Sequence, residues 1–216
     1  MSDIFTLEMS QKLESYLASH ELPSGIGTAE RACSVAAINL AINGKLTDKI
    51  PDCMSIVVGR WIIKVQDATP HEMRNSTEWK SLLPLAAGTG RALEKERAKV
   101  ALDWMCDVVL PILQPVADAG GYGNTWRAMC VEKTRAAAYA AAYAADAAYA
   151  AYAADAADAA AYAADAADAA YAADAAYAAY AADAARAAYA ADAARAAFWQ
   201  SVNPCAVLRA MIEVTA

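Results

Sequence analysis

The sequence predicts an all-α protein with a helical N-terminal body and a long alanine-rich helix behind it. Alanine dominates positions 136–197, and neither Gly nor Pro interrupts that tract. Alanine has the highest intrinsic helix propensity, and a long tract overcomes the cost of helix nucleation. In the preceding residues, apolar side chains recur at three- and four-residue spacings, which is typical of amphipathic helices. No run of alternating β-branched residues indicates a strand.

We expect three segments: a helical body over 1–135, a repeat helix over 136–200 and a short C-terminal helical segment over 201–216. Charge follows this division. The body holds 15 Lys and Arg against 16 Asp and Glu, whereas the repeat holds eight Asp against two Arg. The repeat therefore has a net charge of −6 out of −7 for the chain. Such a surface repels phosphate backbones, so we expect no nucleic-acid binding.

Breaker residues divide the body into its expected helices. Gly-containing turns and caps give the boundaries. Helices are expected over 4–18, from an N-cap at Thr28 to a stop at Asn43–Gly44, from Pro51 through Val65, from a cap at Asn75–Ser76 through Ala87, and from Arg91 to Pro111.

The repeat places a Tyr, Asp or Arg at almost every third position. Three residues turn a helix by about 300°, so the non-alanine stripe drifts by about 60° per step and circles the helix every 18 residues. Tyr162, Tyr180 and Phe198 follow this 18-residue super-period. A heptad coiled coil keeps its apolar residues in one seam, and an amphipathic helix keeps them on one face. The repeat fits neither pattern.

Self-association is the expected role of the repeat. Its alanine surface lets neighbouring helices approach closely, and nine tyrosines between Tyr139 and Tyr189 would otherwise leave apolar rings in water. We therefore expect a homo-oligomer. Two alternatives remain: a solvated stalk that grew by slippage of a short codon repeat, and a tract folded into several shorter helices.

Cysteine and histidine usage argues against a metal site or a disulfide framework. The five cysteines are odd in number and widely spaced, and only two histidines occur. We expect reduced core cysteines and no metal or cofactor. The N-terminus lacks the pattern of a secretion signal, and charges interrupt the alanine tract, so we expect a cytoplasmic protein without a membrane span.

Three Gly-containing turns precede expected helices, and arginines near such helix starts could bind an anion. Tryptophans beside arginines could stack on a planar ligand. The candidate ligand-binding residues are Arg31, Arg60, Trp61, Arg91, Trp126 and Arg127.

The alternative for these residues is structural. The turns would then be ordinary caps, the tryptophans core residues, and the arginines partners of body carboxylates such as Glu30, Glu94 and Asp103. We identify no catalytic residue: His71 lies beside Glu72 without a nucleophile motif. The sequence therefore favours a protein that is not an enzyme.

Parts of the body resemble uncharacterised proteins encoded by bacteriophages and prophages. The stretches that carry the resemblance are ACSVAAINL at 32–40, GKLTD at 44–48, IPDCM at 50–54 and EWKSLLPLAAGTGR at 78–91, followed by an alanine-rich tail with interspersed aromatics. The resemblance implies a viral accessory role in the host cytoplasm, as an inhibitor of a host defence. It supplies no catalytic motif.

Together these observations favour a non-catalytic oligomeric binding protein that acts by ligand sequestration. Its partners would be itself and a host protein or an anionic small molecule, such as a signalling nucleotide. The alternative is a structural helical assembly or spacer protein that has no ligand.

Overall fold

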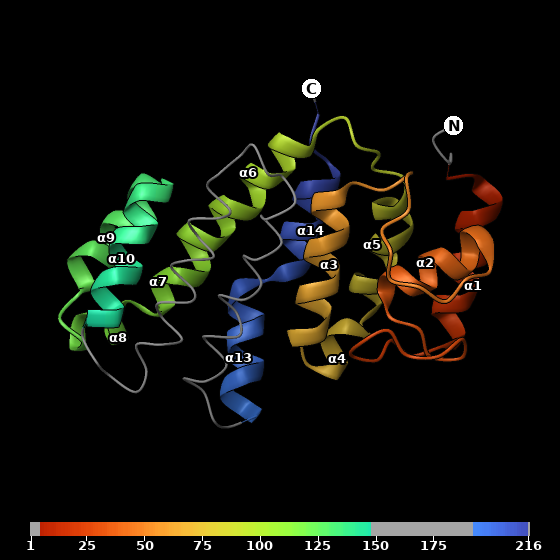
Figure 1. Ribbon diagram of the computed structural model, residues 1–216. Helices are drawn as coiled ribbons and strands as arrows, with labels where there is room; N and C mark the ends of the chain where they lie inside the picture. The colour runs from red at the N-terminus through yellow and green to blue at the C-terminus, as the bar shows by residue number, and fades with distance from the viewer. Residues whose placement is uncertain (1–4, 148–191, 216) are drawn as a thin grey trace. The chain divides into compact units, whose positions relative to one another are not determined.

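The computed structural model describes residues 5–147 and 192–215, and nearly all of the secondary structure within them is helical (Figure 1). The only β pairing in these ranges is an isolated bridge between Gly27 and Ala32. The all-α prediction is therefore confirmed for the described part of the chain. Most of the repeat lies outside those residues, so a continuous helix over 136–200 stays a prediction.

The chain forms two compact units. One comprises residues 1–97 and 204–216, and the other comprises residues 98–203. These boundaries differ from the division expected at 135/136 and 200/201. The C-terminal segment is helical as expected, and it joins the first unit because its helix packs against helices from the body.

The first unit is built around α5, which packs against α1, α2, α4 and α14 (Figure 1). Its helices are α1 Leu7–Ser19, α2 Ser34–Asn43, α3 Ile56–Ala68, α4 His71–Arg74, α5 Thr77–Ala87 and α14 Pro204–Ile212. Trp61 of α3 and Trp79 of α5 are fully buried and stack with their ring centroids 6.2 Å apart. Large aromatic rings thus supply much of the apolar area that stabilises this unit.

Two predicted caps are confirmed. The side chain of Ser76 accepts a hydrogen bond from the backbone N–H of Trp79 at the start of α5. Gly44 ends α2 in the left-handed conformation, with a φ of 72°, which glycine adopts without a steric cost. Local sequence determined both boundaries.

The expected start of α2 at Thr28 is wrong. Thr28 and Arg31 instead close a turn through reciprocal backbone hydrogen bonds of 3.0 and 3.2 Å. The helix begins at Ser34, and Cys33 is its N-cap. The backbone N–H of Ser34 donates to the Gln66 side chain at 2.6 Å. The acceptor for the first backbone N–H of α2 is therefore a side chain of α3, not a neighbouring residue in the sequence.

The expected start of α3 at Pro51 is also wrong. Residues 51–54 form a turn in which Met54 N–H donates to the Pro51 carbonyl at 3.0 Å. The helix begins at Ile56, with Ser55 as its N-cap.

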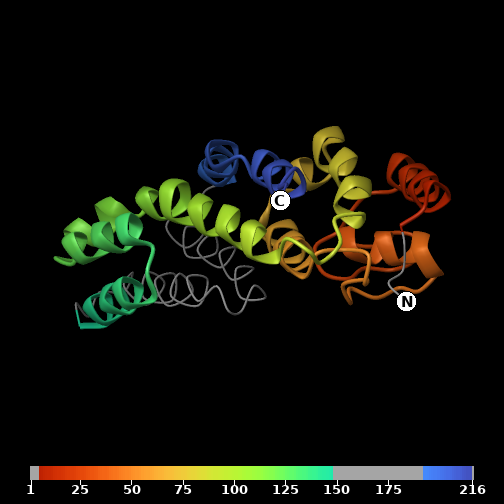
Figure 2. The same cartoon turned by 90° about the horizontal axis from the view of Figure 1, so that it is seen from above.

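The second unit is built around α9, which packs against η1, α7, α8 and α10. Helix α6 Glu94–Trp104 begins in the first unit and continues into the second. The other helices are η1 Met105–Val109, α7 Leu110–Ile112, α8 Gln114–Ala119, α9 Gly123–Glu132, α10 Arg135–Ala147 and α13 Asp192–Val202. Figure 2 shows α10 beside α9.

The helical stretch expected from Arg91 to Pro111 runs from Glu94 to Ile112, so its end agrees with the prediction to within one residue. It passes through a π-helical turn, and the N–H of Leu110 donates to the Met105 carbonyl. Proline lacks an N–H, and its ring would clash with the carbonyl four residues earlier, that of Asp107. The wider turn accommodates the proline, and the helix ends one residue later at Ile112.

Helix α10 is the first part of the repeat, and it packs against α9. Ala138, Ala141 and Ala142 are buried, whereas Ala140 is exposed. These buried positions follow the three- and four-residue spacing of one helix face. Alanine in this part of the repeat thus serves as a packing surface.

Candidate functional site

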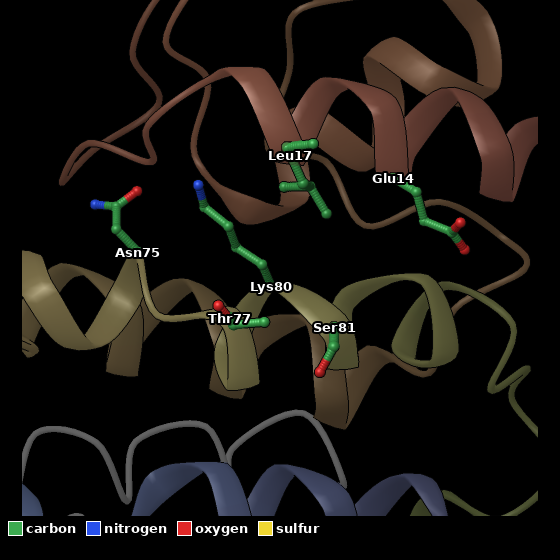
Figure 3. Close-up of a pocket in the computed structure, with 7 residues that line it drawn as sticks. Glu14, Leu17, Asn75, Thr77, Lys80 and Ser81 are labelled. Carbon is green, nitrogen blue, oxygen red and sulfur yellow. The ribbon is translucent and has the colours of Figure 1, made fainter.

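The candidate ligand-binding site is a cleft in the first unit, between α1 and α5 (Figure 3). Its volume is about 310 Å³, near the lower end of the range for ligand pockets. The residues that line it are Glu14, Leu17, Ala18, Asn75, Thr77, Lys80 and Ser81.

Helix periodicity puts these side chains on the cleft. On α5, Thr77, Lys80 and Ser81 are spaced by three and four residues, so they share one face. On α1, Leu17 is buried and forms the apolar part of the wall, whereas Glu14 is exposed at its edge. Figure 3 shows Leu17 pointing from α1 toward α5 and Lys80 extending from α5 toward α1.

Lys80 is the one cationic residue in the lining of the cleft. Its Nζ atom donates to the backbone carbonyl of His20 at 2.8 Å. His20 is the C-cap of α1, so the ammonium lies at the negative end of that helix. An ammonium has three N–H donors, and the His20 bond uses one of them. Lys80 can therefore bind an anionic group while it holds this position.

Other polar groups of the cleft are fixed by hydrogen bonds. Asn75 accepts from the Leu22 backbone N–H at 2.7 Å and donates to the Leu22 carbonyl at 3.1 Å. The hydroxyl of Ser81 donates to the Glu78 carbonyl at 2.8 Å. Glu14 accepts from the hydroxyl of Ser10 at 3.0 Å. These bonds hold the polar side chains in place. The hydroxyl–carboxylate pair among them, Ser10 with Glu14, lies on the exposed surface of α1, and the Ser81 hydroxyl donates to a carbonyl rather than to a general base.

Cys33 and Cys205, the buried cysteines of the first unit with a raised pKa, lie outside this cleft and are poor nucleophiles. Burial raises the pKa of Cys33, and it raises the pKa of Cys205 to about 11. Since the thiolate is the reactive form, neither thiol is activated at neutral pH. Within 5–147 and 192–215, no three His, Cys, Asp or Glu side chains are grouped so that they could hold a metal ion.

The predicted arginines lie on exposed parts of the two units and form ion pairs. Arg31 contacts Glu21 at 3.4 Å, and Arg91 contacts Asp52 at 2.9 Å. Arg127 lies 3.5 Å from Asp118 and also donates to Asn124 at 3.1 Å. The carboxylates in these pairs differ from those suggested by the sequence, since Glu94 and Asp103 bond elsewhere.

The predicted tryptophans are core residues of different units. Trp61 is completely buried against Trp79, and Arg60 before it is exposed on α3. Trp126 is also completely buried, and its Nε1 donates to the Leu110 carbonyl at 2.9 Å. Neither ring presents a face to solvent in this structure.

Lys80 is not among the ligand-binding residues predicted from the sequence. The signal that could have found it is the polar set Thr77, Lys80 and Ser81 on one face of a helix whose other face carries Trp79. The position of that set opposite the end of α1 was not visible in the sequence, because it depends on how the two helices pack.

No protein-family model matches the chain, and no curated protein or solved structure matches it either. Its resemblance to phage proteins stays a prediction. Within the described ranges, no helix combines the length and the apolar character that crossing a membrane requires.

Proposed function

We propose that this protein is a non-catalytic, oligomeric binding protein that sequesters a small ligand with an anionic group. The cleft between α1 and α5 carries the proposal. It offers the ammonium of Lys80, the hydroxyl of Thr77 and the apolar side chain of Leu17 within about 310 Å³. A ligand with one charged end and an apolar or aromatic part fits this combination.

The chemistry of the cleft supports binding rather than reaction. Ser81 and Asn75 already have backbone partners, which fixes their positions. Acyl or phosphoryl transfer requires a nucleophile with an adjacent base, or a set of donors aimed at a developing charge. A single ammonium provides affinity for an anion without either arrangement.

The resemblance to phage proteins supports a specific biological version of this function. In that version the ligand is a small signalling nucleotide of the host, and its capture interferes with a host defence in the cytoplasm. The phosphate would pair with Lys80, and the base would lie on the apolar side of the cleft.

The packing of α10 supports self-association. The described start of the repeat buries Ala138 and Ala141, so alanine faces of this tract form helix contacts. The rest of the repeat is also dominated by alanine and adds further tyrosines. An oligomer would cover these surfaces with neighbouring chains.

A thermal-shift screen tests the binding function. Mononucleotides and cyclic dinucleotides would be added to the full chain, because a ligand that binds only the folded state raises its stability by about 2.7 kcal/mol at one hundred times its Kd. The Lys80→Met variant should lose at least 90% of the affinity for any nucleotide that produces a shift. The matched control is Lys12→Met, since Lys12 is an exposed lysine on α1 that pairs with Glu8.

The outcomes separate the possible sites. Loss of binding in Lys80→Met but not in Lys12→Met supports the cleft. Equal binding by both variants would reject the cleft. Alanine variants of Arg31, Arg60, Arg91 and Arg127 would then test the arginine sites predicted from sequence.

Light scattering tests the oligomer. The chain has a mass of 22.6 kDa, and we expect a multiple of that mass at micromolar concentration. A measured mass equal to a single chain would contradict self-association.

A further inference from the structure

Helix α9 lies against the end of α6 and against η1 in the second unit, and two side-chain contacts define their register. The Nζ atom of Lys133 contacts Asp103 at 2.8 Å, and the Nε1 atom of Trp126 donates to the Leu110 carbonyl at 2.9 Å. Residues 103 and 110 are seven positions apart, and so are their partners 133 and 126, but in the opposite chain direction. The two segments are therefore antiparallel and keep the same register over this length.

This register places two cysteines opposite each other. Cys106 follows Asp103 by one helical turn, and Cys130 precedes Lys133 by one helical turn. The paired positions 103/133, 106/130 and 110/126 share one register. Helices η1 and α9 pack directly against each other, and a disulfide between them requires Cα atoms about 4.4–6.8 Å apart.

The electrostatics of the two thiols agree with this placement. Burial and, to a smaller extent, the neighbouring Cys130 thiol raise the pKa of Cys106 to about 12. Burial raises the pKa of Cys130 to about 11, with an added effect of Asp107 and an opposing effect of Lys133. Both thiols are therefore mostly protonated at neutral pH, so their oxidation is slow there and becomes faster as the pH rises.

We propose that Cys106 and Cys130 are a reversible oxidation site that forms an intramolecular disulfide with hydrogen peroxide. Cys106 is 1% exposed, and Cys130 is half-buried at the edge of α9. The more accessible Cys130 is the sulfur that meets the oxidant first. A peroxide is small enough for such a site, which would exclude a bulky oxidant.

The reaction is a two-electron oxidation. The Cys130 thiolate attacks one oxygen of hydrogen peroxide, the O–O bond breaks, and the departing hydroxide takes up a proton to become water. Cys130 is then a sulfenic acid. The sulfur of Cys106 attacks the Cys130 sulfur, and hydroxide leaves and combines with the proton from Cys106. In total, two thiols are oxidised to one disulfide and one peroxide is reduced to two waters.

The disulfide would connect η1 directly to α9 across the intervening α7 and α8. It closes a loop from residue 106 to residue 130, which restricts the unfolded chain more than the folded one. For a loop of this length, the thermal midpoint should rise by about 5–10 °C. Dithiothreitol should reverse the rise.

Thiol counting and peptide mapping test the site in the full chain. After peroxide treatment, alkylation in denaturant should find three free thiols instead of five, and mass spectrometry should identify a peptide that joins Cys106 to Cys130. Cys130→Ser should abolish the cross-linked peptide. The control Cys205→Ser should retain it, since Cys205 is a buried cysteine of the other unit.

The pH dependence gives a second measurement. The thiolate fraction of Cys130 rises about tenfold per pH unit below its pKa, so the initial oxidation rate should rise about 100-fold from pH 7 to pH 9. Asp103, Asp107 and Lys133 are the charged groups nearest this pair.

The wild-type peptide map decides the proposal even if a serine variant fails to fold. A disulfide between any other two cysteines would overturn it. Oxidation of Cys130 to the sulfinic acid while Cys106 remains a free thiol would also overturn it.

Discussion

The carboxylate of Glu94 accepts a hydrogen bond from the hydroxyl of Ser55 at 2.9 Å, although 39 residues separate them. The same carboxylate accepts the backbone N–H groups of Ile56 and Val57 at 2.9 and 3.0 Å. The Ser55 side chain accepts the N–H of Val58 at 3.2 Å. The first turn of α3 thus has its free donors satisfied, and an acidic residue lies at the positive end of the helix.

Replacing Glu94 with alanine should destabilise the first unit by about 2–3 kcal/mol, because it leaves two backbone donors and one hydroxyl without their acceptor. Urea unfolding of the full chain measures this loss. The control is Glu96→Ala, an exposed position on the same helix, which should change stability by less than about 0.5 kcal/mol. Equal effects of the two variants would contradict the capping role.

Arg97 should not tolerate lysine. It is 3% exposed, and its guanidinium donates to the carbonyls of Thr89, Gly90 and Met211 at 2.8, 3.0 and 3.1 Å. An ammonium cannot reproduce that planar fork, so at least one buried carbonyl would lose its donor. Arg97→Lys should cost about 2–4 kcal/mol in urea unfolding.

The matched control for that variant is Arg91→Lys. Arg91 lies on the surface beside Asp52, and an exposed ion pair contributes at most about 1 kcal/mol. If Arg97→Lys lowered the free energy of unfolding by no more than Arg91→Lys, the three carbonyl contacts would not stabilise the fold.

The contribution of Asp103 to the free energy of unfolding should decrease at low pH. Burial raises the pKa of Asp103, but hydrogen bonds from Lys133 and Lys99 outweigh that effect and hold the pKa below its usual value of 3.8. A group with a lowered folded-state pKa stabilises the protein above the unfolded pKa, and this contribution is lost as the pH falls through the folded value. The stability difference between wild type and Asp103→Asn should therefore be constant from about pH 5 to 9 and shrink below about pH 4.

Unfolding in urea at several pH values checks this dependence. Glu132→Gln is the control because Glu132 is exposed on α9. A difference between wild type and Asp103→Asn that persists unchanged to pH 2 would show that the Lys133 contact does not determine the effect.

A larger side chain on the buried alanine face of α10 should lower the stability of the second unit. Ala141 is completely buried, whereas its neighbour Ala140 is exposed. Ala141→Leu should destabilise the second unit by about 1–3 kcal/mol, because the added atoms have no space beside the packed helix. Ala140→Leu should leave thermal unfolding nearly unchanged. Equal tolerance of leucine at both positions would show that close alanine packing does not hold α10.

The sequence by itself determined the helical class and the boundaries that depend on neighbouring residues. Ser76 caps α5 through its own side chain, and Gly44 ends α2 because glycine adopts a positive φ at little cost. The helical start of the repeat at Arg135–Ala147 follows from alanine propensity. These features need no partner from elsewhere in the chain.

Tertiary structure decided the features that use distant partners. The first N–H of α2 donates to Gln66, and the first turn of α3 donates to Glu94. Neither acceptor is local, so the sequence predicted both helix starts too early. Lys80 faces the end of α1 for the same reason: packing brings distant helices together, and periodicity along one helix does not specify which face of another it meets.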